Sequence, residues 1–182
     1  MPPGPGGDHV DLVLAEWRKE QPRLDTSPVA VIARIGRAGA LLDRELNANF
    51  GRFGLNRSSW DVLASLRRVG APYRRSPTEL YRALMRTSGG MTHLVDRLER
   101  DGLVERVADP EDRRCLLVGL TRKGRALVSR VGPSHLETER RLLATLTQEE
   151  QAELARLLRK LLIPLEDRFS RDDDSLKSRA RP

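Results

Sequence analysis

Residues 87–125 read TSGGMTHLVDRLERDGLVERVADPEDRRCLLVGLTRKGR, and this stretch decides the fold. From Met91 to Leu98 the apolar residues recur every three or four positions, which predicts one buried helix face. The pattern then changes, because residues 103–107 and 115–120 are rich in Val and Leu and are separated by a polar turn with a proline. Two such runs predict a β-hairpin. A helix followed directly by a hairpin is typical of the second half of a winged helix-turn-helix.

The sequence on either side of this stretch predicts further helices. Residues that begin helices stand at Ser27-Pro28, Asn56, Ser76-Pro77, Thr121 and Thr147. In two of these places a Glu three residues later completes a capping box. The expected helices are 8–20, 28–49, 57–69, 76–84, 87–101, 122–146 and one that starts at 148 and is bent or ended by Pro164. We therefore predict a mainly α protein with a small β-hairpin wing, a winged helix-turn-helix that dimerises through its N- and C-terminal helices.

The same pattern divides the chain into regions. Residues 1–7 are expected to be disordered, because they are almost entirely Pro and Gly. Residues 8–55 would form N-terminal helices for dimerisation and a possible ligand site, and residues 56–121 the winged helix-turn-helix. Residues 122–170 would form C-terminal dimerisation helices, because they offer more leucine than one small core needs. Residues 171–182 are charged and are expected to be a flexible tail.

Charge and composition narrow the class of protein. The formal net charge is +7, and residues 57–125 contain 15 Lys or Arg against 9 Asp or Glu. This surplus of six in the middle third predicts an anionic partner, with nucleic acid the first candidate. The chain has no apolar run long enough for a membrane span and no secretory signal at its N-terminus. Its single cysteine, Cys115, fits a reducing compartment, so we expect a cytoplasmic protein.

The start of the predicted helix at 87–101 carries the side chains that could approach base edges. A helix that enters the major groove needs small or hydrogen-bonding side chains in its first turns. Thr87, Ser88, Gly89, Thr92 and His93 supply them. The alternative is that Ser88-Gly89-Gly90 is only a loop.

The predicted hairpin tip is charged, with Arg113 and Arg114 beside Asp109, Glu111 and Asp112. An arginine there could enter a narrow minor groove. The alternative is a solvated turn with internal ion pairs.

At this point the sequence resembles the MarR family. The segment Arg97-Leu98-Glu99, followed by Gly102-Leu103 and Arg106, is similar to that family's RLE-x-x-GL-x-x-R element. The Asp112-to-Arg114 wing and the Leu120-Thr121 helix start, with Gly124, follow it in the family's order. The resemblance covers about residues 28 to 165.

The resemblance implies a function and roles for residues. It implies a homodimer that binds a pseudo-palindromic operator in double-stranded DNA, usually as a repressor released by a small molecule. Arg114 would reach the minor groove with Asp112 as its brace, and Arg97 and Arg113 would join the DNA-binding set. Glu111 stands where many members have Arg or Lys.

A narrower resemblance concerns a ligand. The added N-terminal helix and the segment Trp60-Asp61 are similar to the urate-responsive branch of the family, which implies an effector site formed by Trp17, Asp61 and Arg106. A flat anionic or aromatic molecule could stack on the indole and pair with the guanidinium. Leu94 departs from that branch, which usually has another Arg there. The alternative is that Trp17 is a core anchor and that Asp61 and Arg106 form a structural ion pair.

Other classes of function find less support in the sequence. The three histidines lack neighbours at metal-ligand spacing, so neither a metal nor a cofactor is expected, and no catalytic constellation indicates an enzyme. Two alternatives stay open. One is a winged helix that binds proteins rather than DNA, and the other is a regulator that senses oxidants through Cys115.

Overall fold

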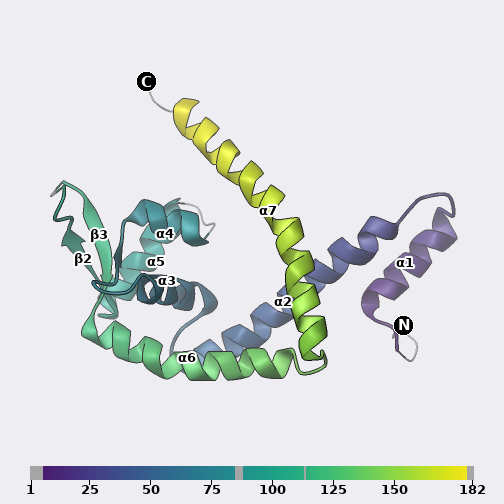
Figure 1. Ribbon diagram of the computed structural model, residues 1–182, viewed down its shortest axis with the longest axis horizontal. Coiled ribbons are helices and arrows are strands. Elements are labelled where there is room, and N and C mark those ends of the chain that lie inside the picture. Colours follow the sequence, from purple (N-terminus) through teal and green to yellow (C-terminus); the bar gives the residue numbers. More distant parts are fainter. Residues whose placement is uncertain (1–5, 85–87, 113, 180–182) are drawn as a thin grey trace. The chain divides into compact units, whose positions relative to one another are not determined.

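The computed structural model describes residues 6–84, 88–112 and 114–179. These residues contain the seven helices and two strands expected from the sequence and one further strand. Figure 1 shows them in order. Their bounds are α1 His9–Glu20, α2 Ser27–Gly51, α3 Arg57–Arg68, β1 Arg74–Arg75, α4 Pro77–Leu84, α5 Ser88–Arg100, β2 Val104–Ala108, β3 Leu116–Leu120, α6 Arg122–Leu142 and α7 Gln148–Arg179. The chain divides into two compact units, Met1–Thr138 and Glu139–Pro182.

The helix starts behave largely as predicted. The side chain of Asn56 accepts the N–H of Ser59 at 2.9 Å, and the backbone N–H of Ser76 donates to Glu79 at 2.7 Å. The prediction for α2 is wrong in one detail. Thr26 rather than Ser27 is the N-cap, and its side chain makes no cap hydrogen bond, while the N–H of Ser27 donates to the side chain of Asp25 at 2.9 Å.

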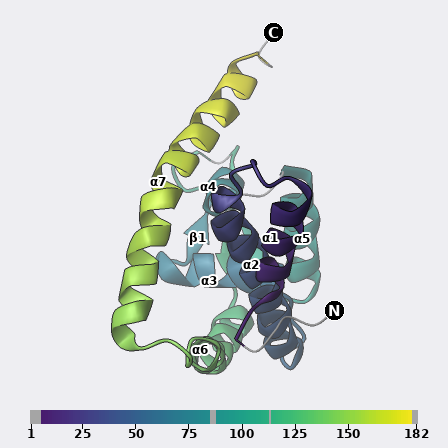
Figure 2. The same cartoon turned by 90° about the vertical axis from the view of Figure 1, so that its right-hand side faces the viewer.

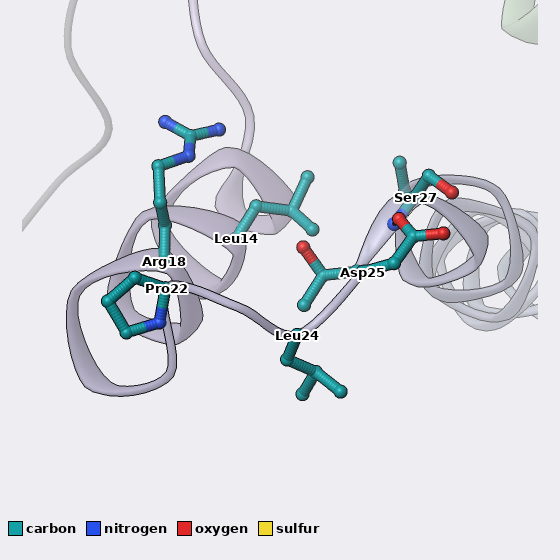
Figure 3. A pocket seen from close by; sticks show the side chains of 8 residues that line it. Leu14, Arg18, Pro22, Leu24, Asp25 and Ser27 are labelled. Atoms are coloured by element: carbon teal, nitrogen blue, oxygen red, sulfur yellow. The ribbon is translucent and has the colours of Figure 1, made fainter.

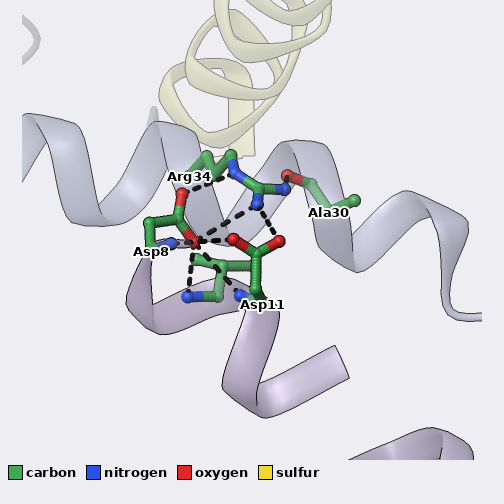
Figure 4. A network of polar contacts seen from close by, with 5 residues as sticks. Asp8, Asp11, Ala30 and Arg34 are labelled. Atoms are coloured by element: carbon green, nitrogen blue, oxygen red, sulfur yellow. Dashed lines mark hydrogen bonds and ion pairs between the residues drawn. The ribbon is translucent and has the colours of Figure 1, made fainter. Parts of the chain in front are cut away.

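The N-terminal helix α1 is fastened to α2 at one end. Arg34 of α2 pairs with Asp8 at 2.7 Å and with Asp11 at 2.6 Å, and it also donates to the carbonyl of Ala30, as Figure 4 shows. The same two aspartates form the capping box that begins α1. In both ribbon views (Figure 1 and Figure 2) α1 lies beside the N-terminal half of α2. Val10 of α1 is buried.

The core of the first unit lies among α3, α4, α5 and the sheet. The period of α5 is confirmed, since Met91, Leu94, Val95 and Leu98 are all buried. An aromatic cluster joins α2, α3 and α6: the rings of Phe50, Trp60 and His135 have centroids 5.1 to 5.4 Å apart. The other buried apolar residues of this core include Val62, Leu63, Leu66, Leu80, Val104, Val118 and Leu120.

The sheet has the order β1-β3-β2 and is antiparallel. The hairpin is confirmed, with Val104 opposite Leu120 at its base and Ala108 opposite Leu116 near its tip. Strand β1 was not expected. Two arginines give no strand pattern, and this strand exists because Arg74 pairs through its backbone with Gly119.

The base of the hairpin meets α5 and α6 at a tight corner. The hydroxyl of Thr121 donates to the carbonyl of Gly102 at 2.7 Å and accepts the N–H of Gly124 at 3.0 Å, so Thr121 caps α6 as predicted. A Cβ on Gly124 would lie 2.0 Å from the carbonyl oxygen of Leu103. Glycine is therefore required there, because the two backbones approach too closely for any side chain.

The C-terminal helices differ from the prediction in extent. Helix α6 ends at Leu142 rather than near Leu146, because a turn follows before the Thr147–Glu150 capping box, which is present (2.8 Å and 3.2 Å). Helix α7 continues through Pro164 to Arg179, so Pro164 does not end the helix. A proline removes one N–H from a helix, and residues 165–179 contain no further Pro or Gly that would end it.

Candidate nucleic-acid interface

Helix α5 presents a polar face opposite its buried one. Thr92 and His93 are exposed, while Met91 and Leu94 on either side of them are buried. Ser88 is the first residue of the helix, which Gly89 continues, so the loop alternative for this segment is wrong; Thr87 lies outside the described residues. The hydrogen-bonding side chains predicted for groove contact therefore stand in the first turns of a 13-residue helix.

Arg97, one of the three arginine candidates for DNA contact, hydrogen-bonds to side chains of the protein itself. Its guanidinium donates to the hydroxyl of Ser59 and, at 3.4 Å, to the side-chain oxygen of Asn56. Both partners belong to the first turn of α3, where Asn56 is the N-cap. Asn56 was identified from the sequence as a helix cap, but its link to α5 has no local signal, because the two residues are 41 positions apart.

The wing tip is a tight turn around Asp112. The N–H of Cys115 donates to the carbonyl of Asp112 at 2.8 Å, and the N–H of Asp109 donates to the carbonyl of Cys115 at 2.9 Å. Arg114 is 91% exposed, and its Nε lies 3.1 Å from the Asp112 carboxylate. Hydrogen bonds from the Arg114 side chain and backbone lower the pKa of Asp112. Asp112 thus holds Arg114 as the resemblance implies; Arg113 lies outside the described residues.

The thiol of Cys115 is exposed at the same turn. The negative charge of Asp112, together with that of Asp109, raises its pKa. A raised pKa keeps the thiol protonated, and the thiolate is the form that reacts with oxidants. This environment disfavours the oxidant-sensing alternative.

Arg106 joins the wing to the helix behind it. It lies on β2 and pairs with two carboxylates of α5, with Asp96 at 2.6 Å and with Glu99. Its backbone N–H also donates to Glu99 at 3.0 Å. Asp96 and then Glu99 raise the pKa of Arg106. These contacts set the position of the hairpin relative to α5.

The three residues expected to bind a ligand have separate neighbours. Asp61 lies 3.4 Å from Arg57 in an i,i+4 pair, Arg106 pairs with α5, and Trp17 is 39% exposed on α1. The contacts given by the described residues do not bring the three together. Leu94 is buried with the core, which agrees with its lack of charge.

An open pocket lies where α1 turns into α2 (Figure 3). Arg18 and Asp25 bring charge to it, and the N–H of Ser27 bonds to Asp25 there. That hydrogen bond lowers the pKa of Asp25, so the pocket contains a fixed carboxylate. Neither Trp17, Asp61 nor Arg106 lines it, and Asp25 would repel an anionic ligand. The lining residues are Leu14, Arg18, Pro22, Leu24, Asp25, Thr26, Ser27 and Ala30.

The described residues contain neither a metal-ligating cluster nor a membrane-spanning helix. No group of three or more His, Cys, Asp or Glu is placed there to hold a metal ion. Within 6–84, 88–112 and 114–179, no helix is both long and apolar enough to cross a membrane.

Comparisons with known proteins agree with this geometry. The model of the MarR family matches residues 53–114, which run from the start of α3 to the wing tip. The HTH-type transcriptional regulator PecS of Dickeya dadantii is 40% identical over 149 residues, which cover 82% of this chain and 90% of PecS. The match therefore extends well beyond the winged helix itself.

Solved structures give the same result. A mutant of MarR from E. coli complexed with operator DNA matches with a TM-score of 0.67 and 28% identity, over 80% of this chain and 97% of that one. Bordetella bronchiseptica BpsR, whose DNA binding is regulated by 6-hydroxynicotinic acid, matches with a TM-score of 0.66 and 26% identity, over 73% and 93% of the two chains.

Proposed function

The chain belongs to the MarR family of transcriptional regulators, and from this premise we propose that it is a homodimer that binds a pseudo-palindromic operator, represses transcription in the cytoplasm and is released by a small molecule. The family consists of regulators rather than enzymes. The single observation that carries the DNA-binding part is the combination of exposed Thr92 and His93 near the start of α5 with a wing tip whose Arg114 is 91% exposed and braced by Asp112.

In the proposed complex each α5 enters a major groove. Ser88, Gly89, Thr92 and His93 would lie nearest the base edges, with Thr87 just before the helix. Arg114, with Arg113 beside it, would reach the flanking minor groove, where a narrow groove has a deeper negative potential. The two half-sites would lie roughly 10 base pairs apart, one turn of the duplex.

Two exposed apolar faces support dimerisation. Helix α2 exposes Val31, Ile32, Ile35 and Leu42, and α7 exposes leucines at the spacing of one helix face. Apolar faces of this length are unusual on a monomer. The exposed large apolar residues of α7 are Leu154, Leu157, Leu161, Leu162, Ile163 and Leu165.

Selection of bound sequences from random duplex DNA tests the proposal. We expect inverted repeats with a fixed spacing, and an affinity that falls steeply with salt, because phosphate contacts release counterions. Arg114→Ala and His93→Ala should each weaken binding to the selected duplex by roughly tenfold. If no duplex is selected at low salt, the winged helix does not act on DNA, and the protein-binding alternative replaces this proposal.

The effector site is a separate part of the proposal. BpsR is regulated by a small aromatic acid, which supports a ligand of that chemistry here. An anion that binds at Arg106 would compete with Asp96 and Glu99 for the guanidinium. Such competition would loosen the wing from α5, so binding would change the DNA-competent geometry.

Aromatic carboxylates and purines, added one at a time, test this site. Tryptophan emission reports on Trp17 in a Trp60→Phe variant, and anisotropy of a labelled operator reports on release. We expect one compound to change both signals, and Arg106→Gln to remove both responses. Compounds that leave both signals unchanged throughout the screen would contradict the effector proposal but not the DNA-binding one.

A further inference from the structure

Arg97 lies on α5, but its position and direction differ from those expected of a residue that contacts DNA. It follows Ser88 by nine residues, which at about 1.5 Å per residue puts it roughly 13 Å from the end of the helix proposed to enter the groove. Its guanidinium turns toward the first turn of α3 rather than away from the protein, and donates to Ser59 and Asn56. A second role for this residue follows from these partners.

The partners of Arg97 are themselves fixed. Ser59 is 1% exposed, and its N–H already donates to Asn56 at 2.9 Å. The Asn56 oxygen thus accepts from both α3 and α5. The buried Ser59 hydroxyl and the shared Asn56 oxygen accept hydrogen bonds from Arg97 only in certain directions. These two contacts therefore fix where the guanidinium lies relative to α3.

Local helix stability does not explain this contact. The N-terminus of a helix carries a partial positive charge, so a cation placed there is electrostatically unfavourable. Arg57, the first residue of α3, adds a second cation at the same end. The guanidinium of Arg97 lies at this end of α3 in spite of the unfavourable local charge. The contact is therefore better explained by its effect on the orientation of α5 relative to α3.

The first turn of α3 is in turn tied to α2. The N–H of Arg57 donates to Asn47 at 2.8 Å, and its guanidinium lies 3.2 Å from Asp43. Both acceptors lie in the C-terminal half of α2. A continuous chain of polar contacts therefore runs from α5 through Arg97 to α3, and from α3 through Arg57 to α2.

We propose that Arg97 is a positioning residue, which sets the orientation of α5 relative to α2 through Ser59 and Asn56 and does not contact DNA. This inference rests on the proposed function, because the orientation matters only if α5 enters a groove and α2 contributes to the dimer. Two α5 helices with the wrong orientation would no longer match half-sites at the preferred spacing.

The test compares Arg97→Ala with Arg100→Ala, a matched control on the same turn of α5 that is exposed and has the same charge. Affinity for a duplex selected by the parent protein is measured by anisotropy over a series of salt concentrations. We expect Arg97→Ala to weaken binding about tenfold while the slope of log affinity against log salt stays equal to that of Arg100→Ala. A slope less steep than that of the control by about 0.9 would indicate a lost phosphate contact and would overturn the proposal. An unchanged affinity would overturn it as well.

Two further measurements separate positioning from general loss of structure. Ser59→Ala should weaken binding in the same way, and the double variant should be no weaker than Arg97→Ala alone. Arg97→Ala should also shrink the preference for the selected half-site spacing over a spacing changed by one base pair, by about threefold or more. Misfolding reduces the active fraction but leaves this ratio unchanged, so an unchanged ratio or additive variants would overturn the proposal. If the parent protein selects no duplex, the proposed function itself is wrong.

Discussion

At the scale of single residues, the corner between α5, β2 and α6 depends on one glycine. A Cβ at Gly124 would meet the Leu103 carbonyl oxygen at 2.0 Å, and that oxygen belongs to backbone that cannot move alone. We expect Gly124→Ala to lower the free energy of unfolding by about 1–3 kcal/mol. Gly132→Ala in the same helix is the control, because nothing lies within 4 Å of its added Cβ. It should stabilise the protein by up to about 1 kcal/mol. Urea unfolding of both variants measures the difference, and equal effects would contradict the close approach.

Cys115 gives a second prediction at this scale. The charge of Asp112 raises the pKa of its thiol, so less thiolate is present at a given pH than for a free cysteine. Asp112→Asn removes that charge and should lower the pKa, which increases the rate of alkylation by iodoacetamide near pH 8. The chain has one cysteine, so the labelling rate reports on this residue alone. A slower rate in the variant would show that Asp112 does not control the thiol.

At the scale of elements, the attachment of α1 should depend on pH. The side-chain hydrogen bond from Arg34 lowers the pKa of Asp8. A carboxylate whose pKa is lowered in the folded state stabilises the contact at neutral pH, and this contribution is lost as the pH falls through the lowered pKa. We expect the attachment of α1 to α2 to weaken as the pH falls below roughly 4, the ordinary range of aspartate, and to be lost below the lowered pKa of Asp8.

Trp17, on α1, reports this separation in a Trp60→Phe background. Its emission should change in acid, and Arg34→Gln should give the acid-type emission already at pH 7. An Arg34→Gln spectrum identical to that of the parent at pH 7 would show that the ion pairs do not hold α1.

Most helix starts could be predicted from the sequence, because their signals lie within a few residues of one another. Asn56, Ser76 with Glu79, and Thr147 with Glu150 mark helix starts because a cap bonds to N–H groups only two or three residues away. Strand β1 has no such signal, since its two arginines pair only by backbone with β3. The sequence could not decide whether Pro164 bends or ends α7, because a proline ends many helices but not all.

The candidate site could be predicted only in part. The residues proposed for DNA contact at the start of α5 and at the wing tip could be named from the sequence because they are close together along the chain. The partners of Arg97 and Arg106 lie on other elements, so the pairs with Ser59, Asp96 and Glu99 could be seen only in three dimensions. For the same reason Trp17, Asp61 and Arg106 stay a prediction as a group.

At the scale of the whole molecule, the exposed face of α7 should control assembly and thereby DNA binding. Leu161→Glu puts a charge on that face and should convert a dimer to monomers, because a buried unpaired charge is costly. Affinity for an inverted-repeat duplex should fall at least about a hundredfold, since two linked half-sites bind together. Ala152→Glu adds the same charge on the opposite side of the helix and should leave both properties unchanged. Light scattering and anisotropy measure them, and a dimeric Leu161→Glu variant would exclude α7 from the interface.

The brace on Arg114 has a consequence for how this protein would search a genome. Residues 109–114 contain three acidic and two basic side chains, so the tip of the wing is formally negative. Seen from several Debye lengths away, it does not attract a duplex. Sliding along unrelated DNA would then depend on the basic residues elsewhere in the winged helix. The tip would add affinity only where the minor groove is narrow enough for Arg114 to leave Asp112 and contact phosphates on both sides of the groove. Such a wing discriminates between sequences without slowing the search among them.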